Sequence, residues 1–313
     1  MILDVLHAIL VAPFKDMVGA PGFLAEVLIG GVASGLMYSL VALGFVLIFK
    51  ASGVFNFAQG ALVLFAALTL VGLMERGVPT IVALGLTAGV MVVLALAIER
   101  VVLRPLVNQE HIILFMATIG LNFFLEGFGE MLWGANVKKL DVGIPQGSFK
   151  LGEILVNQLE LTAALTAAVL VTVLAVFFHG TRIGRALRAV ADDHEAALSI
   201  GIPLKTIWVI VWAVSGIVAL VAGIMWGANS GVQFSLSLIA LKALPVLILG
   251  GFESVPGAIV GGLIIGVGEK MGEVYWGPLV GGAIENWFAY VLALVFLLFR
   301  PQGLFGEKII ERV

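Results

Sequence analysis

Long apolar segments without charged side chains dominate this chain. Asp, Glu, Lys and Arg are absent from residues 27–49, 51–74, 77–98, 161–181 and 206–241. A helix needs about 20 mostly apolar residues to cross a bilayer, and each of these segments is long enough. The last segment has room for one membrane helix and much of another, so the pattern predicts a bundle of membrane-spanning helices.

Four further apolar stretches carry only isolated charges, and they lie at about 111–134, 236–252, 257–275 and 281–299. Together with the uncharged segments they predict about nine transmembrane helices, within a range of eight to ten. The strands of a membrane β-barrel would alternate polar and apolar residues over about 10 positions, whereas these runs are apolar at consecutive positions. We therefore expect an all-α fold, a polytopic helical bundle integral to the membrane.

The composition supports a membrane protein and removes several other classes. Hydrophobic residues make up 61% of the 313 positions and charged residues 12%, against about 25% charged in ordinary globular proteins. The mean hydropathy is +1.15, so the chain needs an apolar solvent. These values exclude a soluble enzyme, a nucleic-acid binder and a disordered chain, and the net charge of −3 offers no surface for a polyanion.

Reactive and metal-binding patterns are missing from the sequence as well. The chain has no Cys, which excludes disulfides and thiolate-bound metals. Its four His residues lack the spacing of a metal site, and no nucleophile motif of the Gly-x-Ser-x-Gly kind occurs. We therefore expect neither a resident metal nor catalysis in this chain.

The apolar pattern divides the chain into three regions. Residues 1–22 are predicted to be an N-terminal segment at the membrane interface, with a short helix over 2–14. A poorly formed first span is the alternative for this segment. Residues 23–303 form the predicted transmembrane domain, and residues 304–313 form a tail.

The basic residues of the loops orient the bundle. Ten of them fall on one side, namely Lys50, Arg100, Arg104, Arg182, Arg185, Arg188, Lys205, Arg300, Lys308 and Arg312. Five fall on the other side, namely Lys15, Arg76, Lys138, Lys139 and Lys150. Because Lys and Arg are enriched in cytoplasmic loops, the first side is predicted to be cytoplasmic. The N-terminal segment then faces outside and the C-terminal tail faces the cytoplasm.

Two loops are long, and they differ in kind. The outer loop, residues 135–159, contains Gly143, Pro145 and Gly147 and is predicted to be a turn-rich surface loop. The inner loop, residues 182–205, is rich in helix-forming Ala and Leu and is predicted to be a pair of cytoplasmic helices. Arg182, Arg185 and Arg188 recur there every three residues, so we expect them to share one helical face.

The inner loop also contains the pattern E-A-A-x-x-x-G, formed by Glu195, Ala196, Ala197 and Gly201. Small Ala side chains allow another protein to approach closely, and Gly201 can end a helix. This pattern alone leaves two readings open, a docking segment for a partner protein and an ordinary solvated loop.

On a cytoplasmic loop, this pattern resembles the coupling segment of ATP-binding-cassette importer permeases. The rest of the chain resembles one branch, the LivH-type permeases of branched-chain amino acid importers. The matching segments are residues 30–50, 54–62, 182–205, 250–262 and 300–306. Other permease families continue the motif with Ile-x-Leu-Pro further downstream. Here Ile202 and Pro203 follow Gly201 directly, so only the first half of that pattern is matched.

The resemblance implies a transport role shared among several proteins. Such permeases pair with a second, similar permease, two cytoplasmic ATPases and a periplasmic substrate-binding protein, in the bacterial inner membrane. The residues that would receive the ATPase motion are Arg185, Arg188, Glu195, Ala196, Ala197 and Gly201. The chain has no G-x-x-x-x-G-K-[ST] loop, so ATP and Mg²⁺ are expected in the partner ATPases and no cofactor in this chain. Branched-chain amino acids are the implied substrates, with urea, small amides and aromatic acids as alternatives.

A helix break is predicted near residue 253. Gly250, Gly251, Pro256 and Gly257 interrupt an apolar run, and broken helices are tolerated in membranes where they pack in protein or line a cavity. Glu253 is the polar residue at that break. We favour a tight turn between two helices, with contact to the ATPase as the alternative for Glu253.

Polar residues inside predicted spans are candidates for the transport pathway, because charges there are costly. The candidates are Asn56, Gln59, Asn122, Glu126 and Lys242. The alternatives are structural: Asn56 and Gln59 would brace a helix start, and Lys242 would pair with a buried carboxylate. For Glu130, Glu269 and Glu273 the alternative to a pathway role is a position near the outer surface, where the binding protein would dock.

Two other transport classes remain open from the residues alone. In an ion-coupled secondary transporter the intramembrane Glu and Lys side chains would carry ions, and in a passive channel no energy source would be needed.

Glycine pairs spaced as G-x-x-x-G recur through the chain and predict close helix crossings. They are Gly31/Gly35, Gly85/Gly89, Gly223/Gly227, Gly257/Gly261, Gly262/Gly266 and Gly268/Gly272.

Overall fold

The computed structural model describes residues 7, 9–106, 109–152, 154–192, 197 and 199–306. Within these residues six helices are long and apolar enough to cross a membrane, namely Pro21–Ser52, Thr80–Leu106, Ile112–Trp133, Gln158–Phe178, Lys205–Ser230 and Val255–Val280. Three apolar helices are shorter, namely Gln59–Glu75, Phe234–Gly250 and Phe288–Phe299. Each predicted stretch therefore contains a helix, but six rather than nine reach the length of a membrane span.

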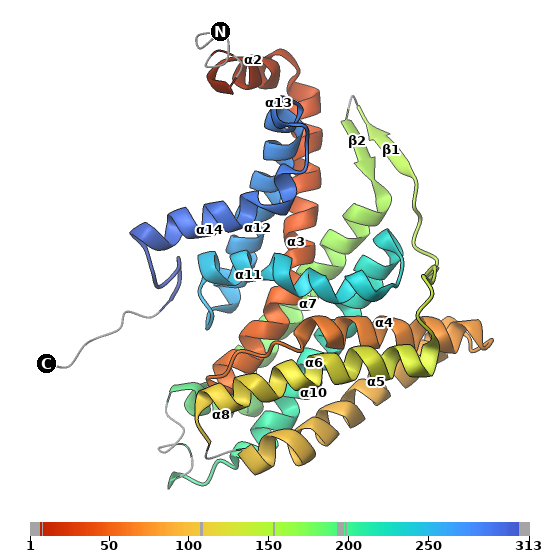
Figure 1. The fold of residues 1–313 in the computed structure, drawn as a ribbon, viewed down its shortest axis with the longest axis vertical. Helices are drawn as coiled ribbons and strands as arrows, with labels where there is room; N and C mark the ends of the chain where they lie inside the picture. Colours follow the sequence, from red (N-terminus) through yellow and green to blue (C-terminus); the bar gives the residue numbers. More distant parts are fainter. Residues whose placement is uncertain are drawn as a thin grey trace, which may run out of the picture.

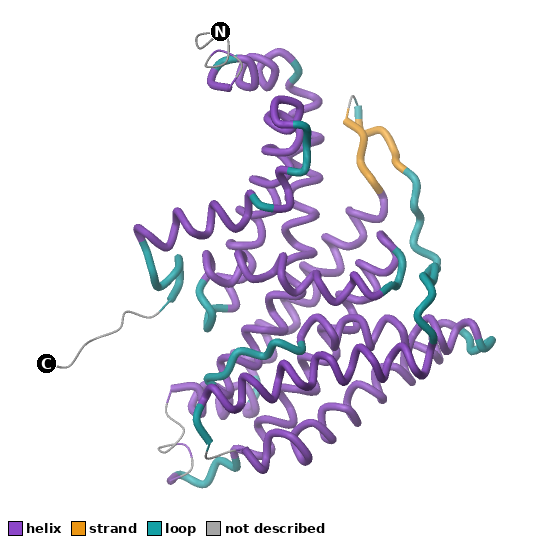
Figure 2. The backbone as a smooth tube through the Cα atoms, in the orientation of Figure 1, coloured by secondary structure: helices purple, strands orange, loops and turns teal. Residues whose placement is uncertain are grey.

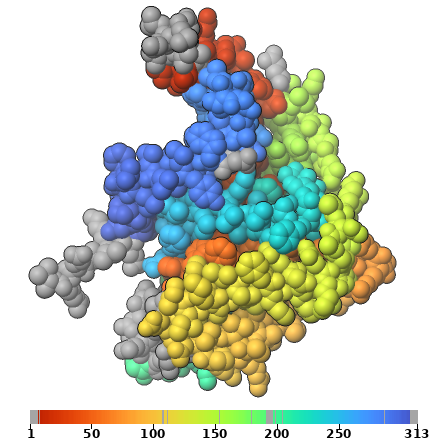
Figure 3. Space-filling view, viewed as in Figure 1, coloured from red at the N-terminus to blue at the C-terminus, as the bar shows by residue number. Residues whose placement is uncertain are grey.

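The chain is almost wholly helical, and Figure 1 shows how its elements are arranged. In chain order the α-helices are α2 (Ala12–Gly19), α3 (Pro21–Ser52), α4 (Gln59–Glu75), α5 (Thr80–Ile98), α6 (His111–Trp133), α7 (Gln158–Gly180), α8 (Arg182–Asp192), α10 (Leu204–Ser230), α11 (Ile239–Gly250), α12 (Val255–Met271), α13 (Gly277–Val280) and α14 (Phe288–Phe299). Short 3₁₀ or π segments are η1 (Glu99–Leu103), η2 (Arg104–Leu106), η3 (Phe234–Leu238), η4 (Gly272–Trp276) and η5 (Ile284–Asn286). In the space-filling view, α14 (deep blue) stands out from the body of the molecule (Figure 3).

Helix α3 is the central element of the fold. It packs against α12, α10, α7 and α11, and α12 lies alongside its N-terminal half (Figure 1). A methyl group on Gly35 would lie 2.4 Å from the carbonyl oxygen of Gly262, and one on Gly266 would lie 2.3 Å from the amide nitrogen of Gly35. The two backbones therefore touch, and the predicted close crossing of these glycine pairs is confirmed. The pair Gly85/Gly89 on α5, by contrast, faces open space.

The uncharged run 51–74 does not form one continuous helix. Helix α3 ends at Ser52, Gly53 adopts a left-handed conformation with φ 67°, and α4 begins at Gln59. Residues 53–58 form a non-helical connection in which Asn56 is wholly buried. Irregular backbone of this kind is stable at membrane depth only where protein surrounds it.

The outer loop contains regular structure that the sequence analysis missed. Strand β1 (Ser148–Leu151) pairs antiparallel with β2 (Ile154–Asn157), and Ser148 lies opposite Asn157. The hairpin lies beside the upper part of α3 in Figure 2 and runs directly into α7. The Asn157 side chain caps that helix by accepting the amide of Leu159 at 2.9 Å. The predicted outer loop therefore contains a small two-stranded sheet, while the described fold as a whole is mostly helical, as predicted.

Helix α2 packs at the N-terminal end of α3. Phe14 meets the ring of Trp276 edge-on at 5.9 Å, and Met17 is buried with Val27 and Tyr275. Of the predicted interfacial helix over residues 2–14, the described part is residues 7 and 9–14, and it is helical except for a turn at Val11. Helix α2 has only eight residues, too few to span a bilayer.

Candidate functional site

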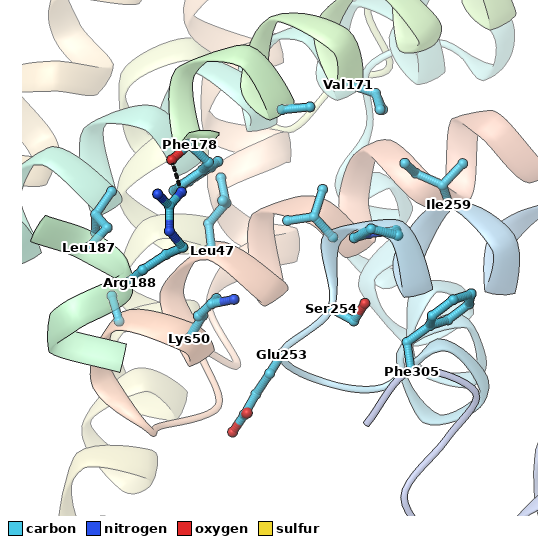
Figure 4. A pocket seen from close by; sticks show the side chains of 14 residues that line it. Leu47, Lys50, Val171, Phe178, Leu187, Arg188, Glu253, Ser254, Ile259 and Phe305 are labelled. Carbon is cyan, nitrogen blue, oxygen red and sulfur yellow. Dashed lines mark hydrogen bonds between the residues drawn. The ribbon is translucent and has the colours of Figure 1, made fainter. Parts of the chain in front are cut away.

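Segments far apart in the sequence meet around one cavity of about 300 Å³. It lies among the C-terminal ends of α3 and α7, helix α8, the connection between α11 and α12, and the C-terminal segment. The residues labelled around it in Figure 4 are Leu47, Lys50, Val171, Phe178, Leu187, Arg188, Glu253, Ser254, Ile259 and Phe305. Lys50 and Arg188 stand on one side and Phe305 on the other. We call this space the inner cavity.

Helix α8 is attached firmly to the end of α7. The guanidinium of Arg188 donates a hydrogen bond to the carbonyl oxygen of Phe178 (Figure 4). The hydroxyl of Thr181 accepts the amide of Gly184 at 2.9 Å, and a methyl group on Gly184 would lie 2.3 Å from the Phe178 oxygen. A side chain at Gly184 would therefore force α8 off α7.

The structure separates the three arginines of the inner loop. Arg182 and Arg185 are exposed, whereas Arg188 turns inward and is partly buried. An α-helix has 3.6 residues per turn, so six residues fall well short of two full turns and Arg188 leaves the face of Arg182. Arg182 and Arg185 thus keep the expected common face, and only Arg188 departs from it.

The other predicted coupling residues follow α8. Ala197 is buried, with 1% of its surface exposed. Gly201 adopts φ 86° with open space around it and precedes α10, which begins at Leu204. Glu195 and Ala196 lie outside the described residues, as does most of the second helix of the expected pair.

The chain turns sharply between α11 and α12. Helix α11 ends at Gly250, Gly251 adopts φ 102°, and the hydroxyl of Ser254 accepts the amide of Gly257 at 3.0 Å. Pro256 lies in the first turn of α12, where its missing N–H costs nothing. A methyl group on Gly257 would lie 2.2 Å from the Gly250 oxygen, so the two helix ends touch.

The C-terminal segment binds this turn through its backbone. The amide of Leu304 donates to the carbonyl of Leu249 at 2.8 Å, and that of Phe305 donates to Gly250 at 3.2 Å. A methyl group on Gly251 would lie 3.0 Å from the amide nitrogen of Gly306. The C-terminal segment and the α11–α12 turn therefore form one unit at the wall of the inner cavity.

Asn56 and Gln59 take part in a buried hydrogen-bond network. Both are fully buried, and the hydroxyl of Ser215 donates to Gln59 Oε1 at 3.0 Å and lies 3.2 Å from the carbonyl of Gly44. Asn56 Oδ1 accepts the amide of Ala58 at 3.1 Å. These contacts join α3, α4 and α10, which fits the bracing role rather than a place on the pathway.

Asn122 and Glu126 line a separate cavity of about 120 Å³. Its walls include the aromatic rings of Phe45, Phe55 and Phe57. Glu126 is 7% exposed. These two predicted pathway residues are thus brought together on α6, apart from Lys242.

Lys242 on α11 has a different neighbour. No ion pair within 4 Å joins it to Glu269 of α12 among the described residues, so the two charges affect each other only over a longer distance. Glu269 is 4% exposed and lies beside the Tyr38 hydroxyl. Tyr38 in turn stacks on Trp226 with ring centroids 5.5 Å apart. Glu269 is enclosed by α3 because the glycines of the two helices bring α12 so close. Within the described chain, its Oε1 atom has no hydrogen-bond partner.

Sequence reasoning missed Lys50, Ser254 and Phe305 as cavity residues. Each lies in a segment that carries the family resemblance. That location was the only sequence feature that could have identified these residues as part of a functional site. Among the described residues no group of His, Asp or Glu is arranged to hold a metal ion.

Comparison with known proteins gives consistent matches along the chain. Residues 27–300 match the family described as branched-chain amino acid transport system / permease component. The permease protein BraD of the high-affinity branched-chain amino acid transport system of Pseudomonas aeruginosa is 29% identical, with 91% of this chain and 97% of BraD covered. The corresponding permease LivH of Escherichia coli K12 is 28% identical, with 93% and 98% covered. The fructose import permease FruG of Bifidobacterium longum is 25% identical, with 79% and 74% covered. All three names describe permeases and none describes an enzyme.

Proposed function

Since this chain belongs to the permease components of branched-chain amino acid transport systems, we propose that it forms one half of the membrane pathway of an ATP-driven amino acid importer. In this proposal a second, similar permease supplies the other half. Two cytoplasmic ATPases bind ATP and Mg²⁺, and a periplasmic binding protein delivers the substrate. The assembly lies in the bacterial inner membrane, with about nine helices of this chain in the bilayer and the inner cavity on the cytoplasmic side.

The observation that carries the proposal is the arrangement around the inner cavity. Helix α8 is fixed to α7 through Arg188, and the α11–α12 turn is fixed to the C-terminal segment. An ATPase that displaces α8 would therefore move the end of α7 past the ends of α3 and α12. Packed helices respond to such a displacement as rigid units, which is how a small shift can change the open side of a pathway.

Three polar residues of the membrane helices, Asn122, Glu126 and Lys242, are proposed to face the moving substrate. Asn122 and Glu126 line their small cavity, and Lys242 lies near Glu269. Intramembrane charges of this kind are costly unless water, substrate or an opposite charge meets them. Uptake by Asn122→Ala, Glu126→Ala and Lys242→Ala variants tests this role, and wild-type rates in all three would remove them from the pathway.

The coupling role is tested by Gly201→Asp and Glu195→Lys in the assembled complex. Both variants are expected to insert normally and to lose the stimulation of ATPase activity by loaded binding protein. Gly143→Asp is the matched control, because Gly143 also has a positive φ, 80° against 86° for Gly201, and open space, but lies in the outer loop. Normal stimulation in the Gly201 and Glu195 variants would refute the assignment.

The substrate class has one specific competitor. FruG is a fructose import permease, so a sugar is the second candidate cargo. Binding of leucine, isoleucine, valine and fructose to the periplasmic partner separates the two, and a preference for fructose would overturn the amino acid assignment.

A further inference from the structure

A groove of about 540 Å³ opens between the N-terminal part of α3, the β1–β2 hairpin, the start of α7 and the end of α12. We call it the outer groove. In Figure 1 the hairpin lies beside the upper part of α3, and β2 contacts that helix. The outer groove thus lies at the opposite end of α3 from the inner cavity, and no residue of the proposed coupling or pathway sets belongs to it.

Opposite charges line the outer groove without being paired. Glu160 comes from α7 and Lys270 from α12. A methyl group on Gly30 would lie 3.5 Å from Glu160 Oε2 and 3.6 Å from Lys270 Cε, so both side chains lie beside this glycine. Among the residues that the structure describes, neither charge forms an ion pair within 4 Å. Both side chains are partly buried, so water only partly compensates their charges.

A second carboxylate lies in the same groove. Glu26 of α3 accepts the backbone amide of Leu155 through Oε2 at 3.4 Å, which ties the hairpin to α3. The remaining walls are mostly aliphatic, including Leu161 of α7 and Val274 after α12. The outer groove therefore combines one ammonium group, two carboxylates and an apolar surface.

A branched-chain amino acid carries the complementary groups, a carboxylate, an ammonium and a short apolar side chain. We propose that the outer groove is a binding site for the amino acid zwitterion on the permease itself, occupied between release from the binding protein and entry into the pathway. Lys270 binds the substrate carboxylate, Glu160 and Glu26 bind its ammonium group, and the aliphatic wall receives its side chain. The inference rests on the proposed function, because it assumes an amino acid cargo.

Gly30 gives the site its depth. Its missing side chain leaves free the space between the carboxylate of Glu160 and the stem of Lys270. A methyl group at this position makes only ordinary contacts, whereas a leucine side chain would fill the space. Gly30→Ala and Gly30→Leu therefore form a matched pair that changes volume and leaves every charge in place.

The test measures binding of radiolabelled leucine to the full chain in phosphatidylcholine nanodiscs by scintillation proximity. Saturable binding is expected, with competition by leucine but not by isoamylamine, which lacks the carboxylate, or by isocaproate, which lacks the ammonium. Lys270→Met, Glu160→Gln and Gly30→Leu should each weaken binding at least tenfold. Gly30→Ala and Lys139→Met, which removes an exposed charge of the outer loop, should bind like wild type.

A phosphatidylethanolamine headgroup has the same pair of charges as the amino acid. Nanodiscs that contain this lipid provide the second arm, in which leucine binding should be unchanged. Loss of leucine binding as phosphatidylethanolamine increases would identify the lipid as the occupant and overturn the proposal. Wild-type leucine affinity in both Lys270→Met and Glu160→Gln would overturn it as well.

Uptake by the assembled transporter separates this inference from the proposed function. If the wild-type complex imports leucine but the three weakened variants keep the wild-type KM, only the outer groove assignment fails. If the wild-type complex does not import leucine at all, the proposed function fails.

Discussion

The inner cavity and the outer groove lie at opposite ends of α3 and are held together differently. At the inner cavity, backbone hydrogen bonds from Leu304 and Phe305 fix the α11–α12 turn, and Arg188 fixes α8 to α7. At the outer groove, the side chain of Glu26 accepts a single 3.4 Å hydrogen bond from the hairpin. We therefore expect the inner end to transmit a force. At the outer end, we expect the unpaired charged side chains to bind a ligand.

One pair of helices connects the two ends. Helices α3 and α12 touch through Gly31, Gly35, Gly262 and Gly266, so their backbones form one stiff unit. The inner cavity and the outer groove are both lined by residues of this unit. A change at the crossing should therefore disturb both ends, whereas a change at either end should disturb mainly that end.

The largest effect is expected from Gly35→Val. Its side chain would collide with the backbone of Gly262, where a Cβ atom would already lie at 2.4 Å, and neither backbone can move without separating the helices. Overpacking of this kind costs about 1–3 kcal/mol or more, so we expect little folded protein in the membrane and no uptake. Gly85→Val is the control, because nothing lies within 4 Å of that position. Equal yields of the two variants by fluorescence size-exclusion chromatography would contradict the crossing.

A large effect confined to the inner end is expected from Arg188→Met. The Phe178 carbonyl loses its donor and α8 loosens from α7, so uptake should fall by about tenfold or more while leucine binding at the outer groove is retained. Lys205→Met removes an exposed basic residue at the same end and should transport normally. Radiolabelled uptake and nanodisc binding on the same preparations give both readouts. Parallel losses of binding and uptake would show that the two ends are not separable.

A smaller effect is expected at the turn from Gly251→Ala. At this position the backbone φ is positive and an added Cβ atom would lie 3.0 Å from the Gly306 amide nitrogen. Gly134→Ala is the control, because Gly134 also has a positive φ, 86°, but an added Cβ atom there would have nothing within 4 Å. Both should lose about 1–3 kcal/mol from backbone strain, because positive φ with extended ψ is essentially restricted to glycine. Gly251→Ala should lose more, because the C-terminal segment is displaced. Thermal unfolding in detergent measures the difference. Identical melting temperatures would mean that the C-terminal segment is not bound to the turn.

The smallest effect is expected from Ser215→Ala in the network between the two ends. Gln59 Oε1 and the Gly44 carbonyl lose a shared donor, which costs about 1 kcal/mol in a buried site. Ser52→Ala is the control, because the Ser52 hydroxyl bonds the Ile48 carbonyl of its own helix. Uptake should be unchanged in both variants, and a transport defect in Ser215→Ala with normal stability would place this network on the pathway.

Much of the helical pattern could be predicted from the sequence, because long apolar runs and glycine spacing are local signals. The hairpin could not, since strands of four residues in a polar loop show too little periodicity to register. The burial of Glu269 and the inward turn of Arg188 depend on what α3 and α7 place beside them. Glu269 meets residues of α3 that are distant in the sequence, and Arg188 meets α7 across a helix junction. The spacing of residues within one segment does not specify either kind of contact.

The central claim is that this chain forms one half of the membrane pathway of an ATP-coupled importer. It is tested most directly by reconstituting the permease with its partner permease, ATPases and binding protein in proteoliposomes and measuring leucine uptake. Uptake should require ATP on the ATPase side and loaded binding protein, and it should be unaffected by a protonophore. Uptake that proceeds without ATP, or that collapses when the protonophore is added, would contradict the claim.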